Sequence, residues 1–139
     1  MKKQRQSEKD GLIVTYFCGL HTYEDAVEAL NELLEMNRGA KQIYEIVINE
    51  ADMKLNFTRA EEQLITDKAK ATFENFERGA LAVVANHDVI FGLSRMLATT
   101  IENDQIAVSV FRTEGLAREW IQEMREMHDQ AFGADGQGA

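Results

Sequence analysis

Arg78-Gly-Ala-Leu-Ala-Val-Val-Ala-Asn-His-Asp-Val-Ile-Phe-Gly-Leu-Ser-Arg-Met-Leu97 is the stretch of this sequence that decides its fold class. Ala80 to Ala85 form an apolar run rich in Val and Ala. A run of this length is typical of a strand buried on both faces and is far too short for a membrane span. A polar turn at residues 86–88 follows, and apolar residues then recur at helical spacing from Val89 to Leu97. A buried strand that leads through a polar turn into an amphipathic helix is the repeating unit of an open α/β sheet.

The same unit recurs along the rest of the chain. Three other apolar runs predict strands, and each is followed by a helical pattern that begins near a good N-cap residue. Thr22 stands three residues before Asp25, which is a variant of the capping box. The other predicted strands span residues 12–18, 42–49 and 106–111, and the other predicted helices span residues 22–37, 59–76 and 113–128.

This order predicts one α/β domain over residues 11–130, with an open, mixed, mostly parallel sheet of four to five strands. Right-handed crossovers should place helices on both faces of that sheet. Residues 1–10 form a polar segment whose basic side chains are expected in solvent. A short edge strand near residues 3–6 would pair with the next strand through a hairpin turn at Asp10-Gly11. The Gly-rich residues 131–139 are predicted to be a disordered tail.

The charge of the chain bounds its partners. A net charge of -9 and a pI near 4.8 argue against nucleic acid, because binding to phosphates needs a concentrated positive surface. They argue equally against docking on anionic membranes. No apolar segment reaches the roughly 18 residues of a membrane span, and no signal-peptide pattern opens the sequence. We therefore expect a cytoplasmic protein.

Cofactor motifs are missing from the sequence. A lone Cys18 excludes an internal disulfide and a cysteine-based zinc site. No Gly-x-Gly-x-x-Gly follows a strand, and no Gly-Lys-Ser/Thr phosphate loop is present. We predict no bound cofactor.

Polar residues follow each predicted strand. If all four strands are parallel, these residues share one edge of the sheet, and ligands of open α/β sheets bind outside that edge. Two imidazoles and several carboxylates there could hold a metal ion or act as acid and base. The alternative is that strand-to-helix turns are polar for structural reasons, with Asp88 as a helix cap. The strand-end residues are His21, Asn49, Glu50, Asp52, His87, Asp88, Arg112 and Thr113.

Three segments together resemble the SpoIIAA-like proteins, small domains grouped with the STAS and Sec14-like folds. Gly19-Leu-His-Thr-Tyr-Glu-Asp25 resembles their Gly-x-x-Thr-x-x-Asp start of the first helix. Arg78 with Ala82-Val-Val84 resembles their Arg-x-Ala-x-Val strand. The third segment is similar to their closing pattern of Phe, an acidic residue and Ala-x-x-Trp-Leu, and consists of Val110-Phe-Arg-Thr-Glu114, Ala117 and Trp120-Ile121.

The resemblance implies a mixed four- or five-stranded sheet with helices packed on it, and a non-enzymatic binding or regulatory role. In anti-sigma-factor antagonists of the broader group, a Ser in an Asp-Ser-Ser-Gly turn at a helix start is phosphorylated. The comparable connection here, residues 49–59, holds no Ser. Its only hydroxyl is Thr58, which also suits the N-cap of the next helix.

The last predicted helix carries a long apolar stripe. Its spacing predicts packing against the sheet, and if part of the stripe were exposed it would suit a protein partner or a dimer. His128 near the predicted end of this helix suits a capping role, because a positive charge is favoured there. The positions predicted to face inward are Leu116, Ala117, Trp120, Ile121, Met124 and Met127.

The leading functional prediction is a binding or regulatory domain that recognises a protein partner or a small apolar or anionic ligand. The runner-up is a small enzyme or metal-binding protein that uses His21, Glu50 and His87, and a third hypothesis is a lipid binder of Sec14 type. Homodimerisation is compatible with the leading prediction. The candidate ligand-binding residues are His21, Glu50, Thr58, His87 and Arg112.

Overall fold

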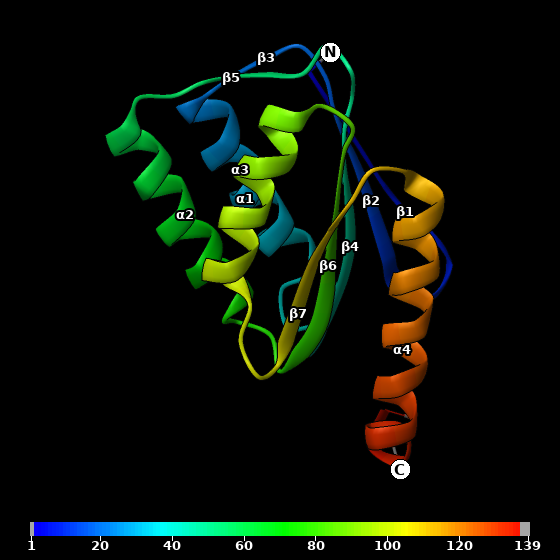
Figure 1. Ribbon diagram of the computed structural model, residues 1–139. Helices are drawn as coiled ribbons and strands as arrows, with labels where there is room; N and C mark the ends of the chain where they lie inside the picture. The colour runs from blue at the N-terminus through cyan, green and yellow to red at the C-terminus, as the bar shows by residue number, and fades with distance from the viewer. Residues whose placement is uncertain (1, 137–139) are drawn as a thin grey trace.

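A five-stranded sheet forms the centre of the molecule (Figure 1). The computed structural model describes residues 2–136. The strands of this sheet are β1 (Lys3–Ser7), β2 (Leu12–Phe17), β4 (Gln42–Asn49), β6 (Arg78–Ala85) and β7 (Ile106–Phe111). They lie in the order β1-β2-β4-β6-β7, with β1 antiparallel to β2 and the other strands parallel. The predicted mixed, mostly parallel sheet is confirmed.

The helices are divided unequally between the two faces of the sheet. They are α1 (Tyr23–Met36), α2 (Arg59–Phe73), α3 (Asp88–Ile101) and α4 (Glu114–Gly136). Three of them, α1 to α3, lie on one face, and α4 lies alone on the other (Figure 1). Each crossover leads to the next strand in the same direction along the sheet, so right-handed connections put all three crossover helices on one side. The prediction that the crossovers would place helices on both faces is therefore wrong, and the second face is covered by α4, which follows the last strand.

Side-chain caps fix where the first two helices begin. The Thr22 hydroxyl accepts a hydrogen bond from the Asp25 N–H, and the Asp25 carboxylate accepts one from the Thr22 N–H. Thr58 and Glu61 form the same reciprocal pair at the start of α2. Both sequence-predicted caps therefore stand where they satisfy the orphan N–H groups of a helix N-terminus.

A tight turn holds β1 beside β2, where the sequence predicts an edge strand. Asp10 and Gly11 both adopt positive φ angles, 64° and 78°, a backbone that Gly adopts freely and Asp tolerates. The Glu8 N–H donates to the Leu12 carbonyl across the turn, at 2.7 Å. The Asp10-Gly11 pair thus fixes the register in which Arg5 stands opposite Thr15.

Each face of the sheet carries its own apolar core. Alternation along β4 sends Ile43 and Val47 toward α1–α3, and Tyr44 and Ile46 toward α4. On the three-helix side Phe73 joins a cluster to which α1, α2 and α3 all contribute. On the opposite side, α4 buries two side chains completely over residues 114–131, those of Ala117 and Ile121.

Two features differ from the sequence-based expectation. The connection over residues 49–57 contains a short strand, β5 (Lys54–Asn56), which pairs in parallel with β3 (Leu20–Thr22) in a separate two-stranded sheet. Strands of three residues show no periodicity in a sequence, so neither was predicted. In addition, α4 continues to Gly136 instead of ending near His128. Residues 131–136 are thus helical and not part of the predicted disordered tail. No proline interrupts the helix there, and a Gly inside a helix costs only about 1 kcal/mol. Residues 137–139 lie outside the described residues.

None of the helices over residues 2–136 has the length and apolar character needed to cross a membrane.

Gly79 on β6 provides a test of the strand packing. A Cβ atom at this position would lie 2.0 Å from the Ile43 carbonyl oxygen on the neighbouring strand, and backbone atoms cannot yield as a flexible side chain can. We expect Gly79→Ala to lower the free energy of unfolding by about 3 kcal/mol or more, measured by urea denaturation.

Gly92 is the matched control for this substitution. It is exposed on α3, and a Cβ there would meet nothing within 4 Å. Gly92→Ala should raise the free energy of unfolding by about 0.5–1 kcal/mol, the gain in helix propensity. Equal effects of the two substitutions would contradict the close approach of β6 to β4.

Candidate functional site

His21 is a buried structural residue rather than part of an open site. Its side chain is 5% exposed, and Nε2 lies 3.0 Å from the Lys2 carbonyl and 3.1 Å from the Cys18 carbonyl. Both partners are acceptors, so Nε2 carries the proton and donates. The ring also packs edge-on against Phe17, with centroids 5.1 Å apart. His21 thus joins the start of β1 to the end of β2.

Arg112 is held at the carboxyl end of β7 by the turn that follows β6. Its Nη1 donates to the Asp88 carboxylate at 2.9 Å and to the Asn86 carbonyl at 3.2 Å. Its guanidinium lies 3.9 Å from the centroid of the Phe91 ring. Asp88 was predicted to cap α3, but it is the first residue of that helix and pairs with Arg112 instead. Arg112 therefore ties two neighbouring strand ends together.

The other predicted residues do not converge on one site. His87 is exposed and its Nε2 contacts the Ala51 carbonyl, which links the β6 and β4 ends. Thr58 is engaged as the cap of α2. Over residues 2–136, no three His, Cys, Asp or Glu side chains are placed to hold a metal ion, so the predicted trio of His21, Glu50 and His87 does not form a metal site.

Glu50 lines a hollow at the ends of β2 and β4. This hollow has a volume of about 480 Å³ and is open to solvent. Side chains beyond the ends of two parallel strands form one wall, and β1 forms the other. The lining residues are Lys3, Gln4, Tyr16, Cys18, Glu50, Ala51 and Asp52.

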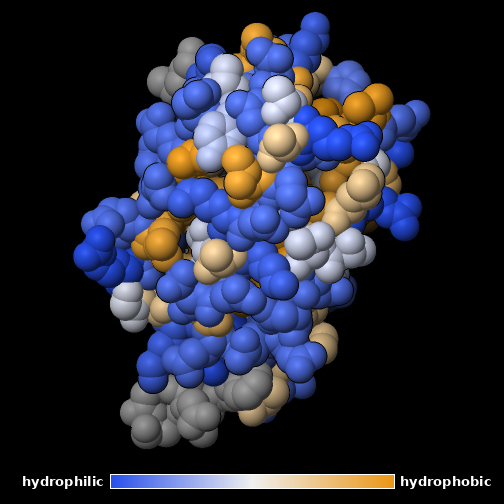
Figure 2. Space-filling view, turned by 90° about the vertical axis from the view of Figure 1, so that its left-hand side faces the viewer, coloured by the Kyte–Doolittle hydropathy of each residue, from blue (hydrophilic) through white to orange (hydrophobic). Residues whose placement is uncertain are grey.

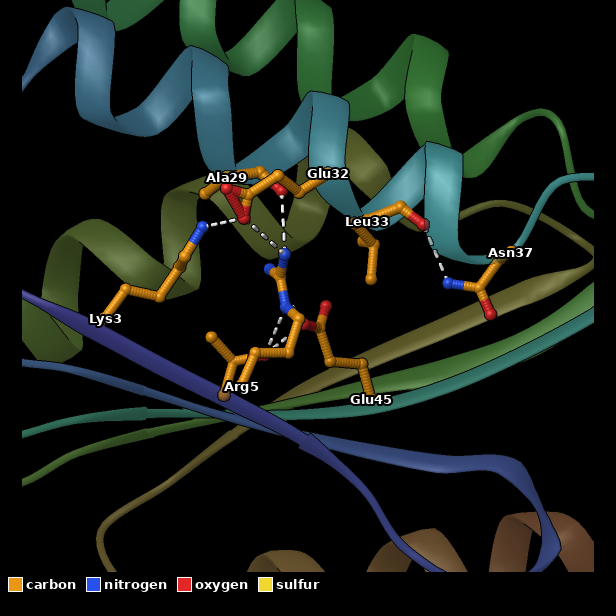
Figure 3. A network of polar contacts seen from close by, with 8 residues as sticks. Lys3, Arg5, Ala29, Glu32, Leu33, Asn37 and Glu45 are labelled. Atoms are coloured by element: carbon orange, nitrogen blue, oxygen red, sulfur yellow. Dashed lines mark hydrogen bonds and ion pairs between the residues drawn. The ribbon is translucent and has the colours of Figure 1, made fainter.

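A buried ionic network lies beneath α1 (Figure 3). Glu45 is 2% exposed in the middle of β4. Its Oε2 accepts a hydrogen bond from the Thr15 hydroxyl at 2.8 Å and lies 3.5 Å from Nη2 of Arg5. Nε of Arg5 donates to the same Thr15 hydroxyl at 2.9 Å. Three adjacent strands, β1, β2 and β4, each contribute one member.

The network continues outward from the sheet to α1. Nη1 of Arg5 donates to the Ala29 carbonyl at 3.1 Å, and Lys3 forms an ion pair with Glu32 on the same helix (Figure 3). Lys2 pairs with Asp25 at 3.0 Å. The expectation that the basic side chains of residues 1–10 lie in solvent is therefore wrong for Lys3 and Arg5, which are partly buried against acidic groups. Lys2 is paired but exposed, and Lys9 is exposed.

The pKa values of two carboxyl groups in the network are shifted in opposite directions. Burial raises the pKa of Glu45 above its ordinary value of 4.5, although Arg5 and Thr15 counteract this. The hydrogen bond from Lys3 lowers the pKa of Glu32. Two sequence signals could have indicated this network. One is the lone Glu within the apolar run 42–49, and the other is the pair of basic residues two positions apart in the predicted edge strand.

Tyr44 and His128 form a second polar contact, on the α4 side of the sheet. The Tyr44 hydroxyl lies 2.6 Å from Nδ1 of His128, and the Arg125 guanidinium lies 4.9 Å from the Tyr44 ring centroid. Burial, with a smaller effect of Arg78, lowers the pKa of His128, and burial raises that of Tyr44. The predicted capping role of His128 is wrong, because α4 continues past it.

An exposed apolar surface runs along α4. Leu116 is 51% exposed and Met127 is 58% exposed, although both were predicted to face inward. Trp120 and Met124 are half-buried between them. The Trp120 ring packs against Phe111 of β7 with centroids 5.6 Å apart. We call these five residues, Phe111, Leu116, Trp120, Met124 and Met127, the α4 stripe.

The outer surface of α1–α3 is different. There, hydrophobic side chains lie in small groups separated by hydrophilic ones (Figure 2), which is normal for a protein surface. The four members of the α4 stripe that lie on α4 instead follow one another at helical spacing over three turns, so they form one continuous row.

The topology defines an open α/β protein wound in one direction, with three helices on one face and one on the other. No family model matches the sequence, and no curated protein matches it. Among solved structures, an uncharacterized DUF3478 family protein from Shewanella loihica, which has a SpoIIAA-like fold, is similar to this chain. The TM-score is 0.61 over 86% of this chain and 91% of the other, at 12% sequence identity. The protein therefore has a SpoIIAA-like fold, as the three sequence segments predict.

The pH dependence of stability tests the buried state of Glu45. A carboxyl whose pKa is raised by folding binds its proton more tightly when folded. Its contribution to stability is thus complete below pH 4.5 and is lost as the pH rises through the raised pKa. Glu45→Gln removes this loss, so the unfolding free energy of the variant minus that of the wild type should increase from pH 4 to pH 8 in urea denaturation.

Glu32→Gln is the control with the opposite sign. Glu32 has a lowered pKa, so its contribution is present above pH 4.5 and is lost as the pH falls. The unfolding free energy of Glu32→Gln minus that of the wild type should therefore become more negative as the pH rises. Parallel trends in the two variants would contradict the burial of Glu45.

Substitutions of two histidines distinguish a structural from an exposed imidazole. His21→Ala should lower the free energy of unfolding by about 2 kcal/mol or more, because it opens a space at a buried position and removes the donor shared by the Lys2 and Cys18 carbonyls. His87→Ala should cost less than about 1 kcal/mol, because His87 is exposed. Thermal unfolding of both variants measures this, and a larger effect at His87 would overturn the assignment.

Proposed function

We propose that this domain acts by binding a partner protein through the α4 stripe. The observation that carries the proposal is the exposure of Leu116 and Met127 in one row with the half-buried Trp120. Continuous exposed apolar rows on soluble domains mark interaction sites. Trp is enriched at the energetic centres of protein interfaces, and Met adapts its shape to a partner.

The engagement of the strand-end residues supports a binding role over a catalytic one. His21 donates to two backbone carbonyls, Thr58 caps α2, and Arg112 is paired with Asp88. A general base or a nucleophile must be within reach of a substrate and of its own activating partner. These three side chains are each engaged in contacts that hold the fold together.

The arrangement of α4 supports the same surface. Arg118 forms ion pairs with Glu8 and Glu114, and Arg125 lies over Tyr44. These arginines close the flank of α4 that faces the β1–β2 hairpin. The opposite flank, toward β7, is the apolar one, so a partner would approach from that side.

Site-specific photo-crosslinking in the native host tests the proposal. A photoreactive residue at position 116 or 127 should yield a discrete covalent adduct with one protein. The same residue at Gln122, which is exposed on α4 outside the stripe, should not yield that adduct. With the captured partner purified, Leu116→Asp should weaken its binding by roughly 30-fold, as expected for a hot-spot residue.

Two results would reject the proposal. One is the absence of an adduct from both stripe positions, and the other is a partner whose affinity is unchanged by Leu116→Asp. Gln122→Ala provides the matched control in the affinity measurement and should leave binding as in the wild type.

A further inference from the structure

One helix is too narrow to cover this face of the sheet. Neighbouring strands lie about 4.8 Å apart and a helix with its side chains is about 10 Å wide. α4 packs on β4, β6 and β7 and leaves part of β7 beside it uncovered. The α4-facing side chains of β7 are Ala107, Ser109 and Phe111, all half-buried. Two of these three side chains are small, so they leave space above the sheet next to Trp120.

N–H groups on the outer edge of β7 are already hydrogen-bonded to side chains, which disfavours pairing of this edge with another strand. The Val108 N–H donates to the Glu102 carboxylate at 3.1 Å. The Asn103 side chain accepts hydrogen bonds from the N–H groups of Gln105 and Ile106, at 2.7 and 2.8 Å. A carboxylate and an amide thus occupy the places that the carbonyl groups of an added strand would take. A partner is therefore expected to pack on the face of β7 rather than pair with its edge.

The solvent side of the α4 stripe carries one sign of charge. At 3.6 residues per turn, Glu119, Glu123 and Glu126 follow one another along the flank of the stripe that points away from the sheet. All three are exposed. They form an acidic rim beside Leu116 and Trp120.

We propose that the partner segment is an amphipathic helix with a basic flank. It packs beside α4 over β7, with its apolar face on the α4 stripe and its Lys or Arg side chains against the acidic rim. This inference rests on the proposed function and names the class of partner. A helix supplies an apolar row at the same spacing as the stripe, because its own contacts recur every three to four residues.

A second copy of α4 fits this surface poorly. An antiparallel pair of α4 helices would bring two acidic rims together, and each chain carries a net charge of -9. Like charges across an interface oppose binding. A basic flank is attracted by the same field that repels a second copy.

Synthetic peptides test the class of partner. Two acetylated, Trp-free helical peptides share one Leu/Ala face and differ only in their flanks, Lys in one and Glu in the other. A third peptide has the Lys composition with scrambled apolar spacing. The reporter is Trp120, the only tryptophan of the chain, whose fluorescence changes when a helix covers it. At 150 mM salt the Lys-flanked peptide should bind at least about tenfold more tightly than either of the others.

Variants of the protein localise that preference. Leu116→Asp should abolish the fluorescence change, and the double variant Glu119→Lys/Glu123→Lys should invert the preference toward the Glu-flanked peptide. Glu28→Lys/Glu62→Lys makes the same change of net charge on α1 and α2, across the sheet from α4, and should leave the preference as in the wild type. Far-UV circular dichroism verifies that each variant is folded.

Equal affinities of the Lys- and Glu-flanked peptides would overturn the inference, as would an equal affinity of the scrambled peptide. A preference unchanged by Glu119→Lys/Glu123→Lys would also overturn it. Crosslinking from positions 116 and 127 combined with any of these results would reject the basic helix and retain the proposed function. Absence of a crosslinked partner in the host would reject the proposed function whatever the peptides do.

Discussion

The direction of the crossovers constrains every other part of this molecule. β2, β4, β6 and β7 follow one another across the sheet in chain order, and right-handed connections then have only one face available to them. A doubly wound sheet reverses its direction at a switch point, and the crevice that opens there holds the ligand. This sheet has no such reversal. Its strand-end residues consequently stand along one edge of the sheet, where His87 and Arg112 link neighbouring strand ends and Glu50 lines an open hollow.

The same constraint determines what happens on the opposite face. A sheet with strands buried on both sides needs cover on both, and here only the segment after β7 can supply it. α4 buries Ala117 and Ile121 in the centre, but no other helix over residues 2–136 lies on that face for Leu116 and Met127 to pack against. The exposed apolar row is thus a consequence of the topology. It lies beside the edge of β7, where Glu102 and Asn103 accept hydrogen bonds from the backbone. The inferred binding surface and the lack of a reversal in the strand order have one origin.

Local signals made much of this fold predictable from the sequence. Thr22 and Thr58 cap their helices through contacts three residues away, and the Ala80 to Ala85 run forms a central strand because its composition suits burial on both faces. The β1–β2 turn follows from Asp10-Gly11 alone. Each of these depends on neighbours within a few positions, which a sequence displays directly.

The parts that could not be predicted depend on contacts between distant segments. The spacing of Leu116 and Met127 is that of a core stripe, and only the lack of a second helix on that face exposes them. His21 was a candidate ligand because it follows a strand, but the Lys2 carbonyl, supplied by a segment expected in solvent, makes it structural. Arg5 and Glu45 are ordinary surface types in a sequence, and only the strand order brings them together.

The Arg5–Glu45 pair also bears on the order in which the chain is assembled. The β1–β2 hairpin is the most local part of the sheet, since a short turn joins its strands. Arg5 of this hairpin nevertheless reaches the Glu45 carboxylate only after α1 has formed and β4 has paired with β2. Before that, a guanidinium in the apolar layer would lack its anion, and an unpaired buried charge is strongly unfavourable. During synthesis β1 leaves the ribosome before the other strands of this sheet, and it is nevertheless among the last of them to be fixed in place. An element that is local in sequence behaves, for folding, as a long-range one.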